Sequence, residues 1–268
     1  MARAETITSA SNPLLKEVRR AIARGGLTSQ GWCVAETFHL LEEALRSDCA
    51  VKVVLAAESV RGVAEGHVRR LNGVKVAVVP DTLLDTISGT ATSQGVIALV
   101  QPPEWTLAQL LRGRPLVVVL DGVQDPGNAG TIARTAEAFG ATGLVFIKGS
   151  VSPFNPKVLR ASAGSLFRLP YIYGVEPALA RAALRQNKAT LYAAVPVRAS
   201  APVRPLVDVD FTAPCGLAIG SEARGVGGEL RGAALDVCIP TVGVESLNAA
   251  VAAGILLYEA RRQRAQLA

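Results

Sequence analysis

Side chains that could do chemistry gather in three glycine-containing segments in the second half of the chain. The first, DGVQDPGNAGTIAR, carries Asn128 and Arg134; the second, GSEARGVGG, carries Glu222; the third, IPTVGVESLNAAV, carries Ser246 and Asn248. Each segment follows an apolar run typical of a strand. Glycines let a ligand approach the backbone closely, and backbone N–H groups bind a ligand's polar edges. The pattern therefore predicts a ligand site built from loops.

Each of these side chains also has a plainer interpretation. Asn128 would cap the start of one helix, and Ser246 would cap the start of the last one. Arg134 lies about 200° around its helix from the apolar stripe and would be a solvated side chain paired with Glu137. Glu222 would be a solvated loop acid. The alternative for Arg134 is a guanidinium held at the mouth of a sheet, beside a glycine-rich entry.

Several kinds of site are disfavoured by the same sequence. The first segment contains neither GxGxxG nor GxxxxGK[ST], which excludes a standard dinucleotide or P-loop site. The 4 cysteines are scattered without a CxxC pair, and the 2 histidines stand in unremarkable contexts. We therefore expect no metal, no disulfide framework and no histidine-based catalysis.

A parallel sheet is the element that must position these segments. Near-continuous apolar runs, typical of strands buried on both faces, occur at 115–121, 143–149, 169–173, 191–196, 215–220 and 236–240. Segments with helical or loop patterns separate them. In such sheets, ligands bind beyond the carboxyl ends of the strands. A last helix, over about 247–264, places Leu247, Val251, Ile255 and Tyr258 on one stripe, which we expect to pack on the sheet.

The first half of the chain reads as a separate, smaller α/β unit. Helical and extended patterns alternate through residues 1–100, and QPPEWTLAQLLRGR at 101–114 has the paired prolines and interspersed charges of a linker with a short helical turn. We therefore expect an α/β protein with one domain over 1–100, a linker over 101–114 and a second domain over 115–268.

Composition favours a cytoplasmic protein and is compatible with a phosphate-bearing partner, although the Arg excess could equally reflect codon bias. The chain has 28 Lys and Arg against 22 Asp and Glu, and this excess of cations, mostly Arg, is compatible with nucleic acid. No stretch has the roughly 18 uncharged apolar residues that span a bilayer, and the first residues lack the apolar core of a secretory signal. We expect no membrane association.

Taken together, the three segments resemble the signature motifs of the SpoU/TrmH family of S-adenosylmethionine-dependent RNA ribose 2'-O-methyltransferases. The motifs NAGTIAR, GSEARG and IPTVGVESLNAAVAAGILLYEARRQ occur in the family's order and separations, and the resemblance covers about 115–264. The first half, with NPLLKEVRR, VAETFHLLEEAL and TSQGVIALV, is similar to the ribosomal-protein-like substrate-binding domain of many members. Two departures are a stretch from Ile239 to Ser246 about one residue shorter than the commonest form, and Ala249 in place of Val.

The resemblance implies a fold and a cofactor. The fold is a C-terminal parallel-sheet SPOUT domain with a deep trefoil knot, in which S-adenosylmethionine binds, joined to the smaller N-terminal α/β domain. General topology rules would have opposed a knot, since threaded chains are nearly absent. By motif alignment, the backbones of Gly220, Ile239 and Leu247 would hold the adenosine part of the cofactor.

The resemblance also implies residue roles. Arg134 matches the family's catalytic arginine. Because a guanidinium is effectively always charged, we expect it to stabilise negative charge developing on the 2'-oxygen rather than to act as a base. Asn128, Glu222, Ser246 and Asn248 match the family's other polar positions and would orient Arg134, the ribose or the cofactor.

The family pairs as homodimers with the active site near the interface, so a homodimer is expected. Arg160 and Arg168 would then contribute to an RNA-binding surface, as could cations of the C-terminal helix, whose plainer role is to suit the helix dipole. We expect 23S rRNA as the substrate, since members that act on tRNA more often lack the N-terminal domain. A tRNA ribose methyltransferase, or a non-catalytic RNA-binding protein that kept the fold, are the alternatives.

Overall fold

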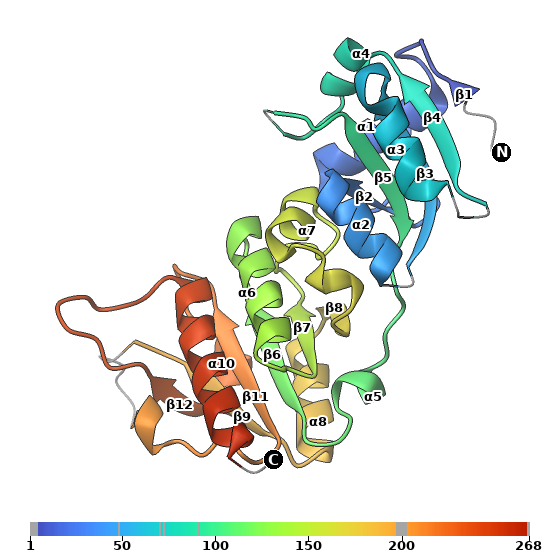
Figure 1. Cartoon of the computed structure of the whole chain (residues 1–268). Coiled ribbons are helices and arrows are strands. Elements are labelled where there is room, and N and C mark those ends of the chain that lie inside the picture. The colour runs from blue at the N-terminus through green and yellow to red at the C-terminus, as the bar shows by residue number, and fades with distance from the viewer. Residues whose placement is uncertain are drawn as a thin grey trace. The chain divides into compact units, whose positions relative to one another are not determined.

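The chain forms two compact units (Figure 1). The computed structural model describes residues 5–47, 49–69, 71, 73–90, 92–196 and 203–266. Unit 1 comprises Met1–Glu104 and Ser152–Arg168, and unit 2 comprises Trp105–Val151 and Leu169–Ala268. The segment 152–168, expected within the second domain, therefore groups with the N-terminal unit. The division between Glu104 and Trp105 falls inside the expected linker 101–114.

Unit 1 is built on a mixed five-stranded sheet. The strands β1 (Glu5–Thr6), β4 (Lys75–Val79), β3 (Ala50–Ala57), β5 (Val96–Gln101) and β2 (Cys33–Glu36) lie side by side in that order. The pairs of β5 with β3 and with β2 are antiparallel, and the other pairs are parallel. Its helices are α1 (Pro13–Arg24), α2 (Phe38–Arg46), η1 (Glu58–Val60), α3 (Arg61–Val68), α4 (Asp81–Asp85), α7 (Pro156–Ser162) and η2 (Ser165–Phe167).

The local sequence explains where the first helix begins and ends. Asn12 caps α1 by accepting a hydrogen bond from the N–H of Leu14, and Pro13 occupies the first helical position. The helix ends at Gly25, which adopts a left-handed conformation with φ 61°. The apolar face of α1 buries Leu15 and Val18 against the sheet core.

Two ion pairs fix the segment 152–168 within unit 1. Glu36, only 3% exposed, accepts hydrogen bonds from Arg160, from the hydroxyl of Ser88 and from the N–H of Gly89. Glu43 pairs with Arg168 in the same way. The two arginines predicted to bind RNA thus have their guanidinium groups on carboxylates of the N-terminal unit.

Unit 2 contains the predicted parallel sheet. Its seven strands, all parallel, lie in the order β10 (Arg204–Pro205), β12 (Leu235–Cys238), β9 (Thr190–Ala194), β11 (Cys215–Gly220), β6 (Leu116–Asp121), β7 (Gly143–Ile147) and β8 (Tyr171–Val175). The helices are α5 (Leu107–Leu110), α6 (Pro126–Ala138), α8 (Pro177–Gln186), η3 (Leu206–Asp208), α9 (Gly228–Arg231) and α10 (Ala249–Ala265). The α/β class and the parallel sheet are confirmed; the trefoil knot stays a prediction.

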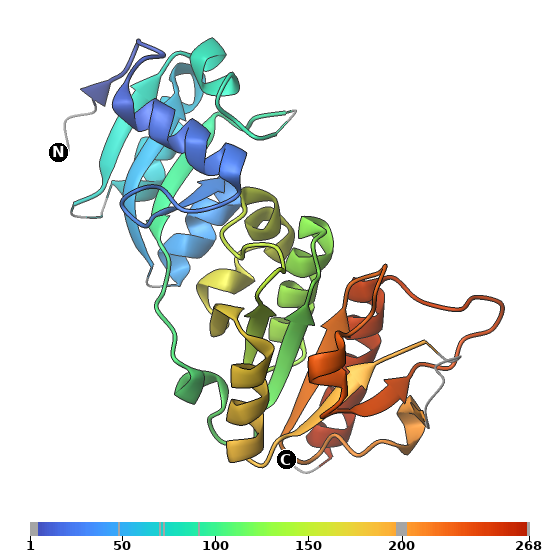
Figure 2. The same cartoon turned by 180° about the vertical axis from the view of Figure 1, so that it is seen from behind.

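Helices cover both faces of this sheet. Figure 1 shows α6 and α10 next to each other on one face, and Figure 2 shows α8 on the other. The strands are accordingly apolar along their length; in β6, for example, all five residues before Asp121 are buried. The turn α5 packs so closely on β7 that a Cβ at Gly143 would lie 2.4 Å from the side chain of Leu110.

The predicted apolar stripe of the last helix is wrong. Leu247 precedes α10, and the side chains of Val251 and Tyr258 are 50% and 57% exposed. The buried face is formed mainly by small residues: Ala249, Ala250, Ala253, Leu256, Leu257 and Ala260. Alanines let α10 approach α6 and β11 closely. The face of small residues is therefore buried, and the larger side chains next to it stay exposed.

Two predicted helix caps are also wrong. The helix α6 begins at Pro126 rather than near Gly130, and its cap is Asp125, whose carboxylate accepts from the N–H of Asn128 at 2.7 Å. Asn248, not Ser246, caps α10. No helix among the described residues is both long and apolar enough to span a membrane.

Candidate active site

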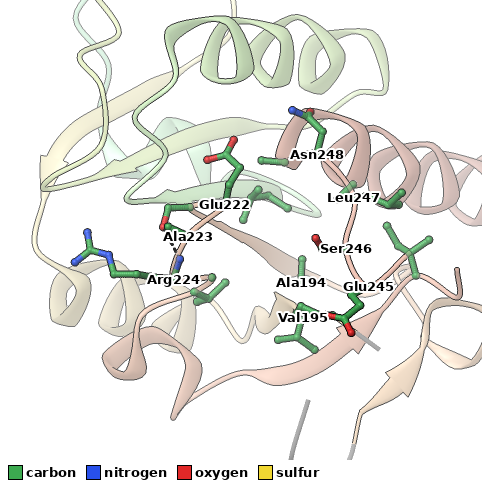
Figure 3. Close-up of a pocket in the computed structure, with 18 of the residues that line it drawn as sticks. Ala194, Val195, Glu222, Ala223, Arg224, Glu245, Ser246, Leu247 and Asn248 are labelled. Atoms are coloured by element: carbon green, nitrogen blue, oxygen red, sulfur yellow. Dashed lines mark hydrogen bonds between the residues drawn. The ribbon is translucent and has the colours of Figure 1, made fainter. Parts of the chain in front are cut away.

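A cavity of about 470 Å³ opens at the carboxyl ends of β9, β11 and β12 (Figure 3). Its walls are the segments that follow these strands and the segment that leads into α10. Every cofactor-binding residue predicted from the sequence lines it, together with three of the polar ones: Gly220, Ile239, Leu247, Glu222, Ser246 and Asn248. The structure therefore has a cavity at the carboxyl ends of the strands, where a ligand was expected to bind.

Gly220 is the point at which one wall folds back on itself. A Cβ on Gly220 would lie 2.0 Å from the carbonyl carbon of Gly225. Because that carbon belongs to the backbone, the clash could not be relieved by moving a side chain. The turn is closed by a hydrogen bond of 2.8 Å from the N–H of Gly225 to the carbonyl of Ser221. Glycine at position 220 is required for this turn, which holds Glu222 at its tip.

Asp121 ties the same wall to the neighbouring strand. Its Oδ2 accepts a hydrogen bond of 2.6 Å from the N–H of Gly227, and a Cβ on Gly227 would lie 3.0 Å from that oxygen. Asp121 is not among the residues predicted from the sequence. Its place as the polar residue that ends an otherwise buried strand is the signal that could have found it.

The three motifs meet in one chain of hydrogen bonds. The Nδ2 of Asn128 donates to Oε1 of Glu222, and the Nδ2 of Asn248 donates to Oδ1 of Asn128 at 3.0 Å. The Oδ1 of Asn248 in turn accepts from the N–H groups of Ala250 and Val251, which caps α10. One side chain from each motif is thus fixed by the next, although they lie 94 and 120 residues apart.

Glu222, at the end of this chain of hydrogen bonds, keeps one carboxylate oxygen that can accept a further hydrogen bond. Within the described part of the chain, Oε2 of Glu222 takes no hydrogen bond, and the residue is exposed. Figure 3 shows Glu222 and Asn248 next to each other at one side of the cavity. A carboxylate oriented by an amide, with one oxygen available, is suited to accept a hydrogen bond from a ligand hydroxyl.

Of the predicted catalytic residues, Asn128 and Arg134 do not line the cavity; within the described residues Asn128 is hydrogen-bonded to two residues that do, and Arg134 is not. Arg134 lies on α6, exposed, six residues beyond Asn128 and therefore about 9 Å further along the helix axis. Arg160 and Arg168 belong to unit 1, where they pair with Glu36 and Glu43. A direct role of these two in binding phosphate would require their ion pairs to open.

An ion pair also contributes to the wall of the cavity. Arg231 lines the cavity and donates from Nε to Oδ1 of Asp236 at 3.2 Å and from Nη2 to Oδ2 at 2.6 Å. The hydrogen bond to this carboxylate raises the pKa of the Arg231 guanidinium. The described residues contain no group of three His, Cys, Asp or Glu side chains that could hold a metal ion.

Both halves of the chain match known protein families. Residues 115–258 match the SpoU rRNA Methylase family, and residues 12–98 match the MRM3-like substrate binding domain. The chain belongs to the SpoU rRNA methylase family. The family predicted from the three motifs is confirmed, and the N-terminal half is confirmed as a substrate-binding domain.

Relatives resemble the chain along nearly its whole length. It is 31% identical to the 23S rRNA (guanosine(2553)-2'-O)-methyltransferase RlmP of Bacillus subtilis, over 95% of this chain and 98% of the relative. An AdoMet-bound rRNA methyltransferase from Sinorhizobium meliloti superposes with a TM-score of 0.84 at 30% identity, covering 97% and 98% of the two chains. The SpoU methyltransferase AviRb of Streptomyces viridochromogenes, in complex with AdoMet, superposes with a TM-score of 0.82 at 27% identity, covering 95% and 98%.

The chain is therefore an S-adenosylmethionine-dependent RNA 2'-O-methyltransferase, as predicted, rather than a non-catalytic RNA-binding protein. The cavity fits that cofactor in size, since small-molecule sites usually measure about 300–1,000 Å³. At Gly220 the wall of the cavity is formed by backbone, because a side chain would not fit there.

Proposed function

We propose that this enzyme methylates a ribose 2'-hydroxyl in 23S rRNA. In this proposal, residues 1–100 bind the RNA, 101–114 connect, and 115–268 transfer the methyl group. The observation that carries it is the hydrogen-bonded chain of Asn128, Glu222 and Asn248 beside the cavity. A 23S rRNA substrate would place the protein in the cytoplasm, where bacterial ribosomes are assembled.

Alignment is the main task of the protein side chains. S-adenosylmethionine supplies a methyl group on a sulfonium, which is already activated for in-line displacement. Glu222, fixed by Asn128, accepts the hydrogen bond of the ribose hydroxyl at Oε2, so it orients the oxygen toward the cavity and takes the proton that the oxygen loses as it is methylated. Asn248 holds Asn128 in the orientation that this requires. Ser246 lines the cavity and contacts the bound cofactor or ribose, and the backbones of Gly220, Ile239 and Leu247 hold the adenosine.

Arg134 stabilises the negative charge that develops on the 2'-oxygen. A guanidinium keeps its proton under all ordinary conditions, so it acts by charge and hydrogen bonding rather than as a base. Since Arg134 does not line the cavity of its own subunit, we propose that it serves the cavity of a second copy. A homodimer would complete two sites at once.

The surface of α6 and α10 supports such a dimer. Val251 and Tyr258 are half-exposed apolar residues of α10, and the Tyr258 ring packs edge-on against Phe139 at 5.7 Å, just beyond α6. Arg134 is exposed on α6, the helix that packs against α10. In a twofold dimer the same surface of each subunit meets its mate, so α6 and α10 of both copies would cover these side chains.

Mixing two inactive variants tests the shared site. Arg134→Ala and Glu222→Ala are each expected to be inactive. If Arg134 acts on the partner's cavity, subunits mixed in equal amounts recover about one quarter of the wild-type activity, because half of the dimers contain one intact site. No recovery after verified subunit exchange would show that Arg134 acts within its own subunit.

Transfer of labelled methyl groups tests the substrate. The purified enzyme, given labelled S-adenosylmethionine, is expected to label protein-free 23S rRNA and not total tRNA, with the label in alkali-resistant 2'-O-methylated dinucleotides. The match of residues 12–98 to a substrate-binding domain favours rRNA, whereas a solved structure that concerns 2-OH methylation of C/U34 on tRNA covers only 57% of this chain. Label confined to tRNA would overturn the 23S rRNA assignment.

A further inference from the structure

A second cavity lies at the other end of the sheet in unit 2. It measures about 360 Å³ and is formed by α8, by the start of β9 and by residues between α9 and β12. Thr190, at the beginning of β9, lines this cavity, whereas Ala194, at the end of the same strand, lines the active-site cavity. At about 3.3 Å per residue, these two positions are about 13 Å apart.

The lining of the second cavity carries three cations and no carboxylate. Arg181, Arg185 and Lys188 all line it, and none of the three forms an ion pair within the described part of the chain. Arg181 and Arg185 are four residues apart on α8, so they lie on one face of the helix, about 5–6 Å from each other at Cβ. The cavity is therefore a concentrated positive site without an internal counter-ion.

The surrounding structure orients one of these cations and fixes the backbone of another. Nη1 of Arg181 donates a hydrogen bond of 3.0 Å to the backbone carbonyl of Glu229 in α9, which orients the guanidinium without neutralising it. Lys188 adopts a left-handed conformation with φ 53° in the turn between α8 and β9. A favourable interaction with the dipole of α8 would account for Arg185 and Lys188 at its end, but not for Arg181 one turn earlier.

We propose that Arg181, Arg185 and Lys188 form a second RNA-binding site, which takes the sugar–phosphate backbone of the substrate RNA at the amino edge of the sheet. This inference rests on the proposed function and extends it. Guanidinium and ammonium groups bind phosphate oxygens without regard to base sequence. RNA that presents a ribose at the carboxyl edge thus gains a second contact, which positions the strand across unit 2.

Salt dependence of RNA binding tests this site directly. Arg185→Gln and Lys188→Asn remove one charge each from exposed positions, and asparagine tolerates the left-handed turn. Arg181 is left intact because it also contacts α9. Arg112→Gln, an exposed arginine on a turn elsewhere in unit 2, is the matched control. Binding of protein-free 23S rRNA is measured over a range of salt concentrations.

The logarithm of the RNA association constant falls as the logarithm of the salt concentration rises. Each of the two variants is expected to make this slope shallower by about 0.7–0.9, and the double variant by about twice that. The KM for 23S rRNA should rise, with the affinity for S-adenosylmethionine and the rate at saturating RNA unchanged. Slopes equal to that of Arg112→Gln, while the wild type binds rRNA, would overturn the second site alone. A wild-type enzyme that binds no 23S rRNA would overturn both this inference and the proposed function.

Discussion

Two polar clusters in this enzyme use the same side-chain chemistry for different ends. In unit 1, Glu36 is buried and accepts from Arg160 and two further donors. In unit 2, Glu222 is exposed, accepts from Asn128 and keeps an oxygen available at the edge of a cavity. A carboxylate whose partners are all internal supports the fold, whereas one that is oriented but unsaturated is available to a ligand. Substitutions in the two clusters should therefore separate a loss of stability from a loss of activity.

Glu36→Ala should have the largest effect, and it should fall on stability. Removing the carboxylate leaves Arg160, Ser88 and the N–H of Gly89 without their partner, which costs about 3–5 kcal/mol for a buried pair. Urea unfolding followed by Trp32 fluorescence reports on unit 1. A Trp105→Phe background silences the other tryptophan, whose buried Nε1 has no hydrogen-bond partner in the described chain.

The matched control for that change is Glu65→Ala, which breaks the exposed pair of Glu65 with Arg61 in the same unit. An exposed helix pair contributes well under about 1 kcal/mol. If Glu36→Ala destabilises unit 1 no more than Glu65→Ala does, the carboxylate of Glu36 does not support the fold as described.

Arg134→Ala should reduce turnover by about a hundredfold or more, the usual loss for a donor that stabilises charge in the transition state. The urea midpoint should stay at the wild-type value because the side chain is exposed. Calorimetric titration should give an S-adenosylmethionine affinity within a few-fold of wild type. A parallel loss of cofactor binding would show that Arg134 has another role.

Asn248→Asp separates the two tasks of one side chain. An aspartate still caps α10 through an oxygen, but it cannot donate to Oδ1 of Asn128. Loss of one hydrogen bond, worth about 0.5–1.5 kcal/mol, predicts up to about a tenfold fall in kcat with unchanged stability. Asn12→Asp, the same change at the cap of α1, is the control and should leave kcat unaltered. Equal activity of both variants would remove Asn248 from the site.

The smallest effect is a pH dependence of stability in unit 1. Burial raises the pKa of Glu43, but hydrogen bonds and charge from Arg168 and Arg46 more than offset it, so the pKa is lowered. A lowered pKa means that Glu43 stabilises the fold above its unfolded value, near 4.5, and that this contribution is lost as pH falls through the folded value. Glu43→Gln should therefore flatten the acid limb of stability against pH below about 4.5, measured by urea unfolding. An unchanged limb would contradict the pairing.

The sequence predicted which loops line the cavity better than it predicted the packing around them. Motif spacing placed Glu222 and Asn248 at the carboxyl ends of parallel strands, and the topology of such a sheet brings those ends together. The buried face of α10 could not be predicted, because small alanines pack closely while Val251 and Tyr258 stay exposed. From hydrophobicity alone, Val251 and Tyr258 would be expected to be buried in preference to the alanines.

Long-range polar contacts were the other gap. Nothing local shows that Asp121 binds the N–H of Gly227, more than a hundred residues away. The same holds for Arg160 and Arg168, predicted to bind RNA, which the fold pairs with Glu36 and Glu43. Sequence indicates the charge of a side chain, but only the fold shows whether that charge is already neutralised.

A double-mutant cycle on Asn128 and Asn248 tests most directly whether the three motifs act as one site. Single-turnover methyl transfer to 23S rRNA is measured for Asn128→Ala, Asn248→Asp and the double variant at saturating S-adenosylmethionine. If the hydrogen-bonded chain aligns the ribose as a unit, the double variant is about as slow as Asn128→Ala alone. Losses that multiply would show that the two residues act independently, which contradicts the single aligned site.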